Sequence, residues 1–144
     1  MFETMPYPMI VDSGAAESVL PTGWCPQIQT TAPAECRKYT SANGSTITNE
    51  GDKVVSMVTR NGSWKSMRFQ VCDVIRPIAS VNDICELGHS VVFHAEWGGR
   101  GSFVLNHESG EKTWMTATDG VFVFEAKVAP AKNQNKPIVG RQER

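Results

Sequence analysis

Two Asn-Gly pairs, Asn43-Gly44 and Asn61-Gly62, constrain the fold of this chain more than any other feature of its sequence. Asn-Gly favours the tight turn that joins two antiparallel strands, because both residues tolerate a positive φ. Apolar and polar residues alternate on both sides of the second pair, as in half-buried antiparallel strands. The pattern predicts a hairpin over residues 53–74 whose apolar face carries Val54, Val58, Met67, Phe69 and Val71. The first pair predicts another hairpin, over residues 39–58, with Asn43-Gly44 at its tip.

Shorter apolar runs elsewhere predict further strands. They cover Met9–Val11, Ala16–Leu20, Val91–Phe93, Ser102–Leu105, Lys112–Met115 and Val121–Val128. The sequence predicts one helix, over Pro77–Leu87, which Ser80 can cap and Gly88 can end. The proline-containing stretch Pro21–Lys38 predicts a long loop with little regular structure. Together these elements predict an all-β domain with one helix.

The length and composition of the chain suit one globular domain. Its 144 residues are 40% hydrophobic and 20% charged, as in soluble folded proteins. We expect a lead-in over residues 1–8, the domain over residues 9–128, and a disordered tail or linker over residues 129–144. Because the chain starts almost directly on a strand, we expect it to be a segment of a longer polypeptide.

Charge and hydropathy exclude several partners at this stage. A net charge of −1 gives no electrostatic reason to bind nucleic acid or an anionic membrane. No apolar run approaches the roughly 20 residues that span a bilayer, and no basic segment followed by an apolar one marks a secretory signal. We therefore expect an intracellular, cytoplasmic protein.

The cysteines and histidines predict no metal or cofactor. The four cysteines form no C-x-x-C pair, and without a secretory signal they are expected to be reduced thiols. A disulfide between Cys25 and Cys36 is the alternative. The three histidines, His89, His94 and His107, belong to no tight cluster of metal ligands in the sequence.

The segment Met9–Pro21 carries the candidate chemistry. Three apolar residues lead directly into Asp12, Ser13 and Gly14, and a second apolar pair follows at Val19-Leu20. By itself Asp-Ser-Gly is an ordinary turn between two strands. The same order of residues also delivers a carboxylate from a buried strand to the floor of a cleft. In that arrangement the serine hydroxyl can hydrogen-bond near the carboxylate, and glycine lets the backbone approach it closely.

Taken in order along the chain, several segments resemble the retropepsin-like aspartic proteases, the dimeric peptidases of retroviruses and retrotransposons. The protease segments of copia-type polyproteins are the most similar. Asp12-Ser13-Gly14-Ala15 resembles the active-site motif, and Ala42-Asn43-Gly44-Ser45 the flap hairpin. Phe69–Val74 and Ile78–Val81 resemble the strand and the apolar segment that precede the helix of this family. The resemblance covers residues 9–93 and extends more loosely to Val128.

The resemblance implies a retropepsin-like closed β-barrel protomer with one short helix and extra C-terminal strands. It implies an aspartic endopeptidase that cleaves an extended peptide, in polyprotein processing, and needs neither metal nor cofactor. The chain holds one copy of the motif, so activity would require a homodimer in which Asp12 of each protomer contributes one carboxylate. Ser13 and Gly14 would support the carboxylates, and the flap of Ala42, Asn43, Gly44 and Ser45 would close over substrate.

Two departures from the family pattern stand out. Ile78-Ala79-Ser80 replaces the apolar-apolar-glycine triplet before the helix. Few residues precede Asp12, where retroviral enzymes have an N-terminal strand that joins the dimer sheet.

The remaining acids have ordinary interpretations, and two other functions stay open. Asp73 and Asp83 are expected to be structural, the latter in the first turn of the helix, and Asp52 and Asp119 to lie in turns. One alternative keeps the fold without the chemistry, as an inactive dimerisation or peptide-binding module. The other is an unrelated β-sandwich or β-barrel that binds a partner through its loops.

Overall fold

The computed structural model describes residues 7–31, 38–40, 44, 46–48, 50–94 and 101–129. The strands are β1 (Tyr7–Asp12), β2 (Val19–Pro21), β3 (Lys38–Thr40), β4 (Thr46–Thr48), β5 (Gly51–Thr59), β6 (Trp64–Cys72), β7 (Ile78–Ser80), β8 (His89–Val92), β9 (Phe103–Asn106), β10 (Lys112–Trp114), β11 (Thr116–Thr118) and β12 (Val121–Val128). The one α-helix in this part of the chain is α1 (Val81–Glu86). No helix among these residues is long and apolar enough to cross a membrane.

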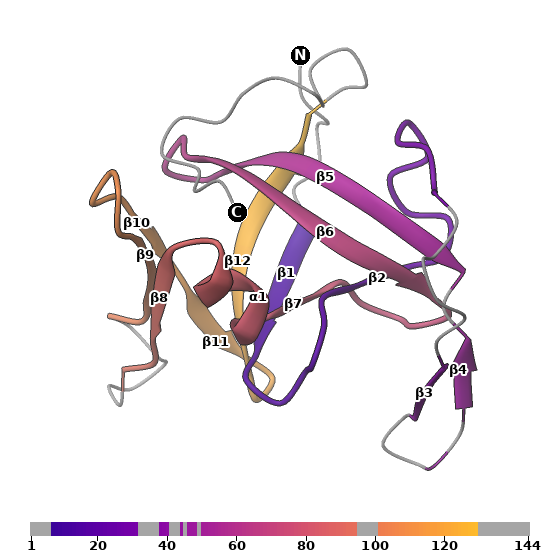
Figure 1. Ribbon diagram of the computed structural model, residues 1–144. Helices are drawn as coiled ribbons and strands as arrows, with labels where there is room; N and C mark the ends of the chain where they lie inside the picture. Colours follow the sequence, from indigo (N-terminus) through magenta and orange to yellow (C-terminus); the bar gives the residue numbers. More distant parts are fainter. Residues whose placement is uncertain are drawn as a thin grey trace.

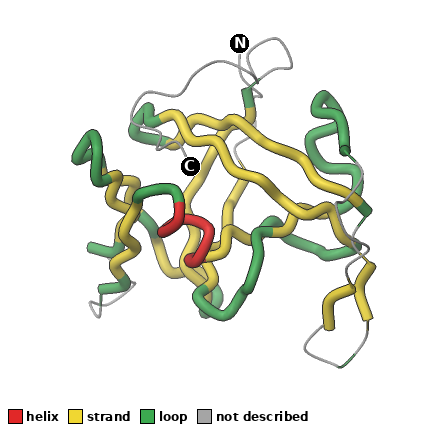
Figure 2. The backbone as a smooth tube through the Cα atoms, viewed as in Figure 1, coloured by secondary structure: helices red, strands yellow, loops and turns green. Residues whose placement is uncertain are grey.

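Six of the strands close into a barrel. They follow the order β1-β7-β2-β6-β5-β12, and β12 pairs with β1 to complete the circle, while β11 extends the sheet beyond β12. Figure 1 and Figure 2 show the barrel with α1 against one end and the small sheet β10-β9-β8 beside it. The expected closed, mainly β fold with one short helix is therefore confirmed for the described residues.

The C-terminal strand takes the place next to the first strand. β12 runs antiparallel to β1, from Tyr7 opposite Ala126 to Val11 opposite Phe122. β1 thus gains its antiparallel neighbour from the far end of the chain, where the retroviral pattern expects an N-terminal strand. The expected domain was residues 9–128. β1 begins at Tyr7, before that start, and Ala129, just past that end, is buried.

The hairpin around Asn61-Gly62 is confirmed. β5 and β6 pair antiparallel from Gly51 opposite Val71 to Val58 opposite Trp64, and Gly62 has the positive φ, +85°, that the turn requires. The apolar face was predicted wrongly for β5. Val55 and Met57 are buried there, and Val54 is 41% exposed.

Lys53 explains why the alternation in β5 was assigned to the wrong face. Its side chain points inward and is only 6% exposed. The amine Nζ donates to the backbone carbonyls of Trp24 and Cys25, at 2.9 Å each. A buried lysine is tolerated when its ammonium is hydrogen-bonded in this way. In an alternating strand pattern, however, lysine ordinarily indicates a position that faces solvent.

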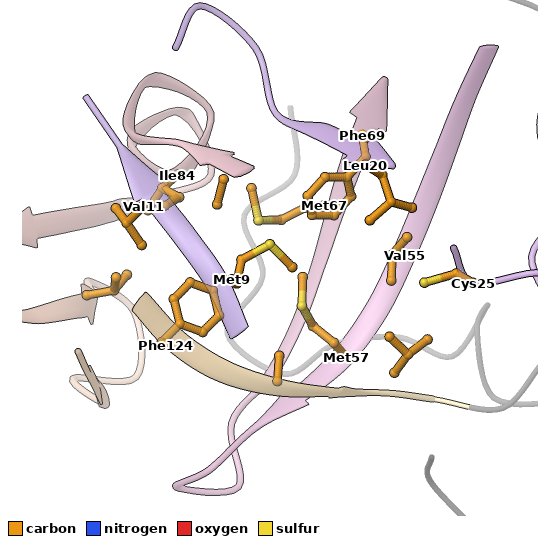
Figure 3. Packing of buried hydrophobic residues seen from close by; sticks show 14 of the residues in the cluster. Met9, Val11, Leu20, Cys25, Val55, Met57, Met67, Phe69, Ile84 and Phe124 are labelled. Atoms are coloured by element: carbon orange, nitrogen blue, oxygen red, sulfur yellow. The ribbon is translucent and has the colours of Figure 1, made fainter. Parts of the chain in front are cut away.

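The core lies inside the barrel. Met9 and Val11 of β1 meet Met57, Met67 and Phe69 of the β5–β6 hairpin (Figure 3). Phe69 and Met57 are fully buried, and each such side chain contributes about 1.5–3 kcal/mol through removal of apolar surface from water. This burial fixes β1, and with it the position of the residue that follows Val11.

The helix is shorter than the sequence predicted. Residues 78–80 form β7 rather than the first turn of the helix, because they pair with β1 and β2. Ser80 still caps α1 by accepting a hydrogen bond from the backbone N–H of Asp83, and Gly88 follows its end with a φ of +85°. β11 was missed, since all three residues of Thr116–Thr118 are exposed and the strand has no apolar face to detect.

The remaining strand predictions are correct in position and differ at their ends. β2 is shorter than the predicted Ala16–Leu20 and begins at Val19. β3 and β4 form the hairpin expected around Asn43-Gly44, and Figure 1 shows it projecting from the barrel. That hairpin ends at Thr48, and β5 is a separate strand.

Candidate active site

Asp12 lies at the end of β1, where the chain leaves the barrel. Beside it β1 runs parallel to β7, with Val11 opposite Ala79 and Asp12 opposite Ser80. Residues 13–18 then form a loop that leads into β2, which runs parallel to β6. Met9 and Val11 are buried while Asp12 is half-buried. The carboxylate is therefore held by a buried strand and remains reachable from solvent.

Gly14 contacts the Asp12 carboxylate directly. The backbone N–H of Gly14 donates to Asp12 Oδ1 at 2.7 Å. A Cβ atom at position 14 would lie 3.3 Å from the same oxygen, tighter than an ordinary contact. Glycine thus allows the close backbone approach that the sequence suggested, and it leaves the carboxylate with one oxygen bound to the turn.

The other predicted site residues make no described contact with the Asp12 carboxylate. Ser13 is exposed and makes no hydrogen bond with the other described residues. Of the predicted flap, Gly44 is exposed with a φ of +89°, while Ala42, Asn43 and Ser45 lie outside the described residues. The strands on either side of the flap are paired, with Thr40 opposite Thr46.

A buried hydrogen-bond network holds the loop of residues 13–18, called the Asp12 loop below, against the start of α1. Asp83 Oδ2 accepts from the backbone N–H of Ser18 at 2.8 Å and from the Ser18 hydroxyl at 2.7 Å. Ser18 Oγ in turn accepts from the backbone N–H of Ser80 at 2.9 Å, and Ser80 Oγ donates to the carbonyl of Ala15 at 2.9 Å. Ser18 and Ser80 are almost completely buried, and the network holds the loop at Ala15 and at its last residue, Ser18.

Sequence reasoning gave Asp83 and Ser80 smaller roles than the structure does. Asp83 is structural, as expected, but it acts by holding Ser18 across 65 residues of sequence rather than through the helix dipole alone. Ser80, where the retroviral pattern has glycine, both caps α1 and hydrogen-bonds the Asp12 loop. Ser18 was not identified at all, because nothing local marks a serine whose partner is distant in sequence.

A cavity of about 230 Å³ lies beside this loop. Three of its lining side chains are acids, and the single cation among them, Arg68, already hydrogen-bonds Asp52 at 3.3 Å. Asp12 does not line it. The lining residues are Glu17, Met67, Arg68, Gln70, Asp83, Glu86 and Leu87.

Two other chemistries find little support among the described residues. Burial, assisted by the carboxylates of Glu50 and Glu17, raises the pKa of Cys72 to about 11, so this thiol stays protonated at neutral pH and is a poor nucleophile. No group of three or more His, Cys, Asp or Glu side chains in the described part of the chain could hold a metal ion. Cys36, the second half of the possible disulfide, lies outside it.

Searches against known protein families, curated proteins and solved structures found no match to this chain. One chain supplies one Asp12 carboxylate, at the end of a buried strand and beside a hydrogen-bonded polar network.

Proposed function

We propose that the chain is one protomer of a dimeric aspartic endopeptidase of the retropepsin-like, retroelement type. In the dimer, Asp12 of each protomer would face its copy across a two-fold axis. Two carboxylates this close share one proton and titrate as a pair. An extended peptide segment of a polyprotein would be the substrate, bound as an additional strand.

The chemistry would use both members of the pair. The ionised Asp12 takes a proton from a water molecule as that water attacks the scissile carbonyl carbon. The protonated Asp12 of the partner subunit donates its proton to the carbonyl oxygen. The resulting tetrahedral intermediate collapses when the C–N bond breaks and the amine leaves with a proton from the pair. The bond to Gly14 N–H would hold each carboxylate in the orientation that this exchange requires.

The observation that carries the proposal is the position of Asp12 at the end of β1, paired with Ser80 of β7. The loop that follows leads into the parallel pair β2–β6 and is held by hydrogen bonds of Ser18 and Ser80. A surface turn needs no such support, because water satisfies its polar groups. A catalytic carboxylate does need it, since small displacements of reacting groups are costly in rate. The exposed position of Ser13 also fits a site that a second chain completes.

The test is a peptide-cleavage assay at acidic pH with a mixed-sequence substrate. We expect Asp12→Asn to abolish cleavage, a loss of at least about 1,000-fold, because the amide cannot take the proton from water. Asp73→Asn, which changes an exposed acid at the end of β6, is the matched control and should cleave normally. Cleavage that persists in Asp12→Asn would refute the mechanism.

Protein concentration gives a second, independent test. A dimeric site requires specific activity to rise with concentration until the dimer is fully formed, and sedimentation should show the dimer over the same range. A strict monomer that still cleaves would contradict the paired-carboxylate proposal. Peptide binding without cleavage by the unmodified protein would identify an inactive peptide-binding module.

A further inference from the structure

A second cavity, of about 40 Å³, lies at the C-terminal end of α1, with Ile84 and Leu87 in its wall. It is lined by β6, the end of α1, β12 and the three-stranded sheet β8–β10. Its wall is mainly apolar, with a few polar side chains from β6, β8, β9 and β10. The lining residues are Trp64, Lys65, Ser66, Met67, Ile84, Leu87, His89, Val104, Asn106, Thr113 and Phe124.

The pairing of the three-stranded sheet explains which side chains face this cavity. Val104 stands between Val91 of β8 and Thr113 of β10, and Asn106 stands opposite His89. Because side chains alternate across a strand, these residues share one face of the sheet. The sheet thus turns polar groups toward the barrel, where a core sheet would turn only apolar ones.

Lys65 and His89 are the charged and titratable groups of the cavity wall. Lys65 Nζ lies 3.2 Å from His89 Nε2, and no described carboxylate forms an ion pair with Lys65. Burial lowers the pKa of His89 to about 4, with Lys65 and His107 acting in the same direction. His89 is therefore neutral at pH 7, and its Nε2 accepts a hydrogen bond from the Lys65 ammonium. Burial also lowers the pKa of Lys65, partly offset by Glu111.

Two further polar atoms of the wall lack hydrogen bonds among the described residues. They are Thr113 Oγ1, on a residue only 3% exposed, and His89 Nδ1. If Nε2 accepts from Lys65, Nδ1 carries the ring proton and is a donor. The carbonyls of Leu87 and Ile84 lie near the ring and raise its pKa slightly, but neither completes a hydrogen bond of normal geometry. The wall therefore holds two groups that can donate, His89 Nδ1–H and the Thr113 hydroxyl, without an acceptor among the described residues.

We infer that this cavity is a binding site for a short-chain monocarboxylate. The alkyl chain would occupy the apolar space against Met67 and Val104, and the carboxylate would accept from the Lys65 ammonium. The Thr113 hydroxyl would supply a further donor to the same group. A carboxylate fits these observations because it has only acceptors and would pair with an ammonium that forms no ion pair with a described carboxylate.

The size of the cavity limits the ligand. One water needs about 10–15 Å³ of such volume, so a cavity of about 40 Å³ holds three or four heavy atoms, with the head group at its rim. The ligand class is thus a carboxylate of about three to five carbons. For so few atoms we expect a dissociation constant on the order of millimolar.

The test is a titration of the full chain carrying Asp12→Asn with butyrate and with 1-butanol, which has the same chain and no charge. The signals are the methionine methyl resonances. We expect butyrate to shift the methyl resonance of Met67, which lines the cavity. The methyl resonance of Met57, which is buried in the barrel core, should not move. Butanol should bind at least about 10-fold more weakly, since its uncharged hydroxyl replaces a charge-assisted bond to the ammonium with a weaker one.

Two variants assign the head group. Lys65→Met keeps most of the stem and should reduce butyrate binding to the level of butanol, whereas Lys127→Met, on an exposed lysine of β12, should not. Thr113→Val should weaken butyrate binding about 3-fold or more without unfolding the protein, through loss of one hydrogen bond. The inference is overturned if butanol binds as well as butyrate, if Lys65→Met binds butyrate unchanged, or if Met67 shows no saturable shift. These outcomes are independent of proteolytic activity.

Discussion

The two ends of α1 carry polar clusters of opposite character. At its start, Ser18, Ser80 and Asp83 are mutually hydrogen-bonded and hold the Asp12 loop. At its end, Lys65 and His89 share one contact, and Thr113 Oγ1 has no partner among the described residues. A fully satisfied buried network rigidifies the structure around it, whereas a partly satisfied one is costly unless something else completes it. The first cluster therefore fits a positioning role and the second fits a binding site.

Removing the acceptor at the start of α1 should have the largest effect on stability. Asp83→Ala leaves the Ser18 backbone N–H and hydroxyl without their shared partner, and Ser18 is only 1% exposed. We expect a loss of about 2–4 kcal/mol in the free energy of unfolding, measured by urea denaturation. Asp73→Ala should change the same quantity by less than about 0.5 kcal/mol. Equal effects of the two variants would mean that the network does not hold the loop.

Acid should weaken the cluster at the end of α1 through His89. The pKa of its side chain is about 4 in the folded protein, against 6.5 for an ordinary histidine. The unfolded state therefore takes up the proton first, and the stability that neutral His89 contributes is present above pH 6.5 and is lost as pH falls toward 4. Since the ring is partly exposed, we expect a loss of about 1–2 kcal/mol.

Urea denaturation at a series of pH values measures this loss of unfolding free energy. The variants to compare are His89→Gln and His107→Gln, the latter at an exposed residue. The first variant should flatten the stability profile between pH 6.5 and 4 relative to the unmodified protein, because glutamine accepts from Lys65 without titrating. The second should change the profile much less, because His107 is only a minor cause of the lowered pKa of His89. A profile that His89→Gln does not alter would place the pH dependence elsewhere.

The smallest effect, and one of opposite sign, is expected at Thr113. Thr113→Val keeps the shape of the side chain and removes a buried hydroxyl that lacks a partner among the described residues. We expect the unliganded protein to gain up to about 1 kcal/mol, measured as a rise in the urea midpoint. Ser18→Ala removes a hydroxyl that is fully bonded and should instead destabilise. Destabilisation by both variants would show that the two clusters do not differ as the contacts indicate.

Local chemistry determined a good part of the fold. The Asn61-Gly62 turn, the cap at Ser80 and the strand Val121–Val128 follow from residues within a few positions of one another. The same holds for the position of Asp12 at the end of an apolar strand. These features were predictable because each is stabilised by its own neighbours in sequence.

Long-range contacts decided the rest. The face of β5 depended on the Lys53 amine reaching two carbonyls of a distant loop, so the buried residues are Val55 and Met57 instead of Val54 and Val58. Whether residues 78–80 extend the helix or form β7 depended on their pairing with β1. Register and facing of strands are set by partners that lie far away in the sequence.

By itself, then, the sequence determined an all-β chain that presents Asp12, Ser13 and Gly14 after a buried strand. Only the tertiary structure decided that β12 closes the barrel beside β1 and that Ser18, Ser80 and Asp83 fix the Asp12 loop. It also decided that Lys65 and His89 meet at a cavity. The physical reason is that a turn or a cap is made by adjacent residues, whereas a polar network or a cavity exists only once distant strands have packed together.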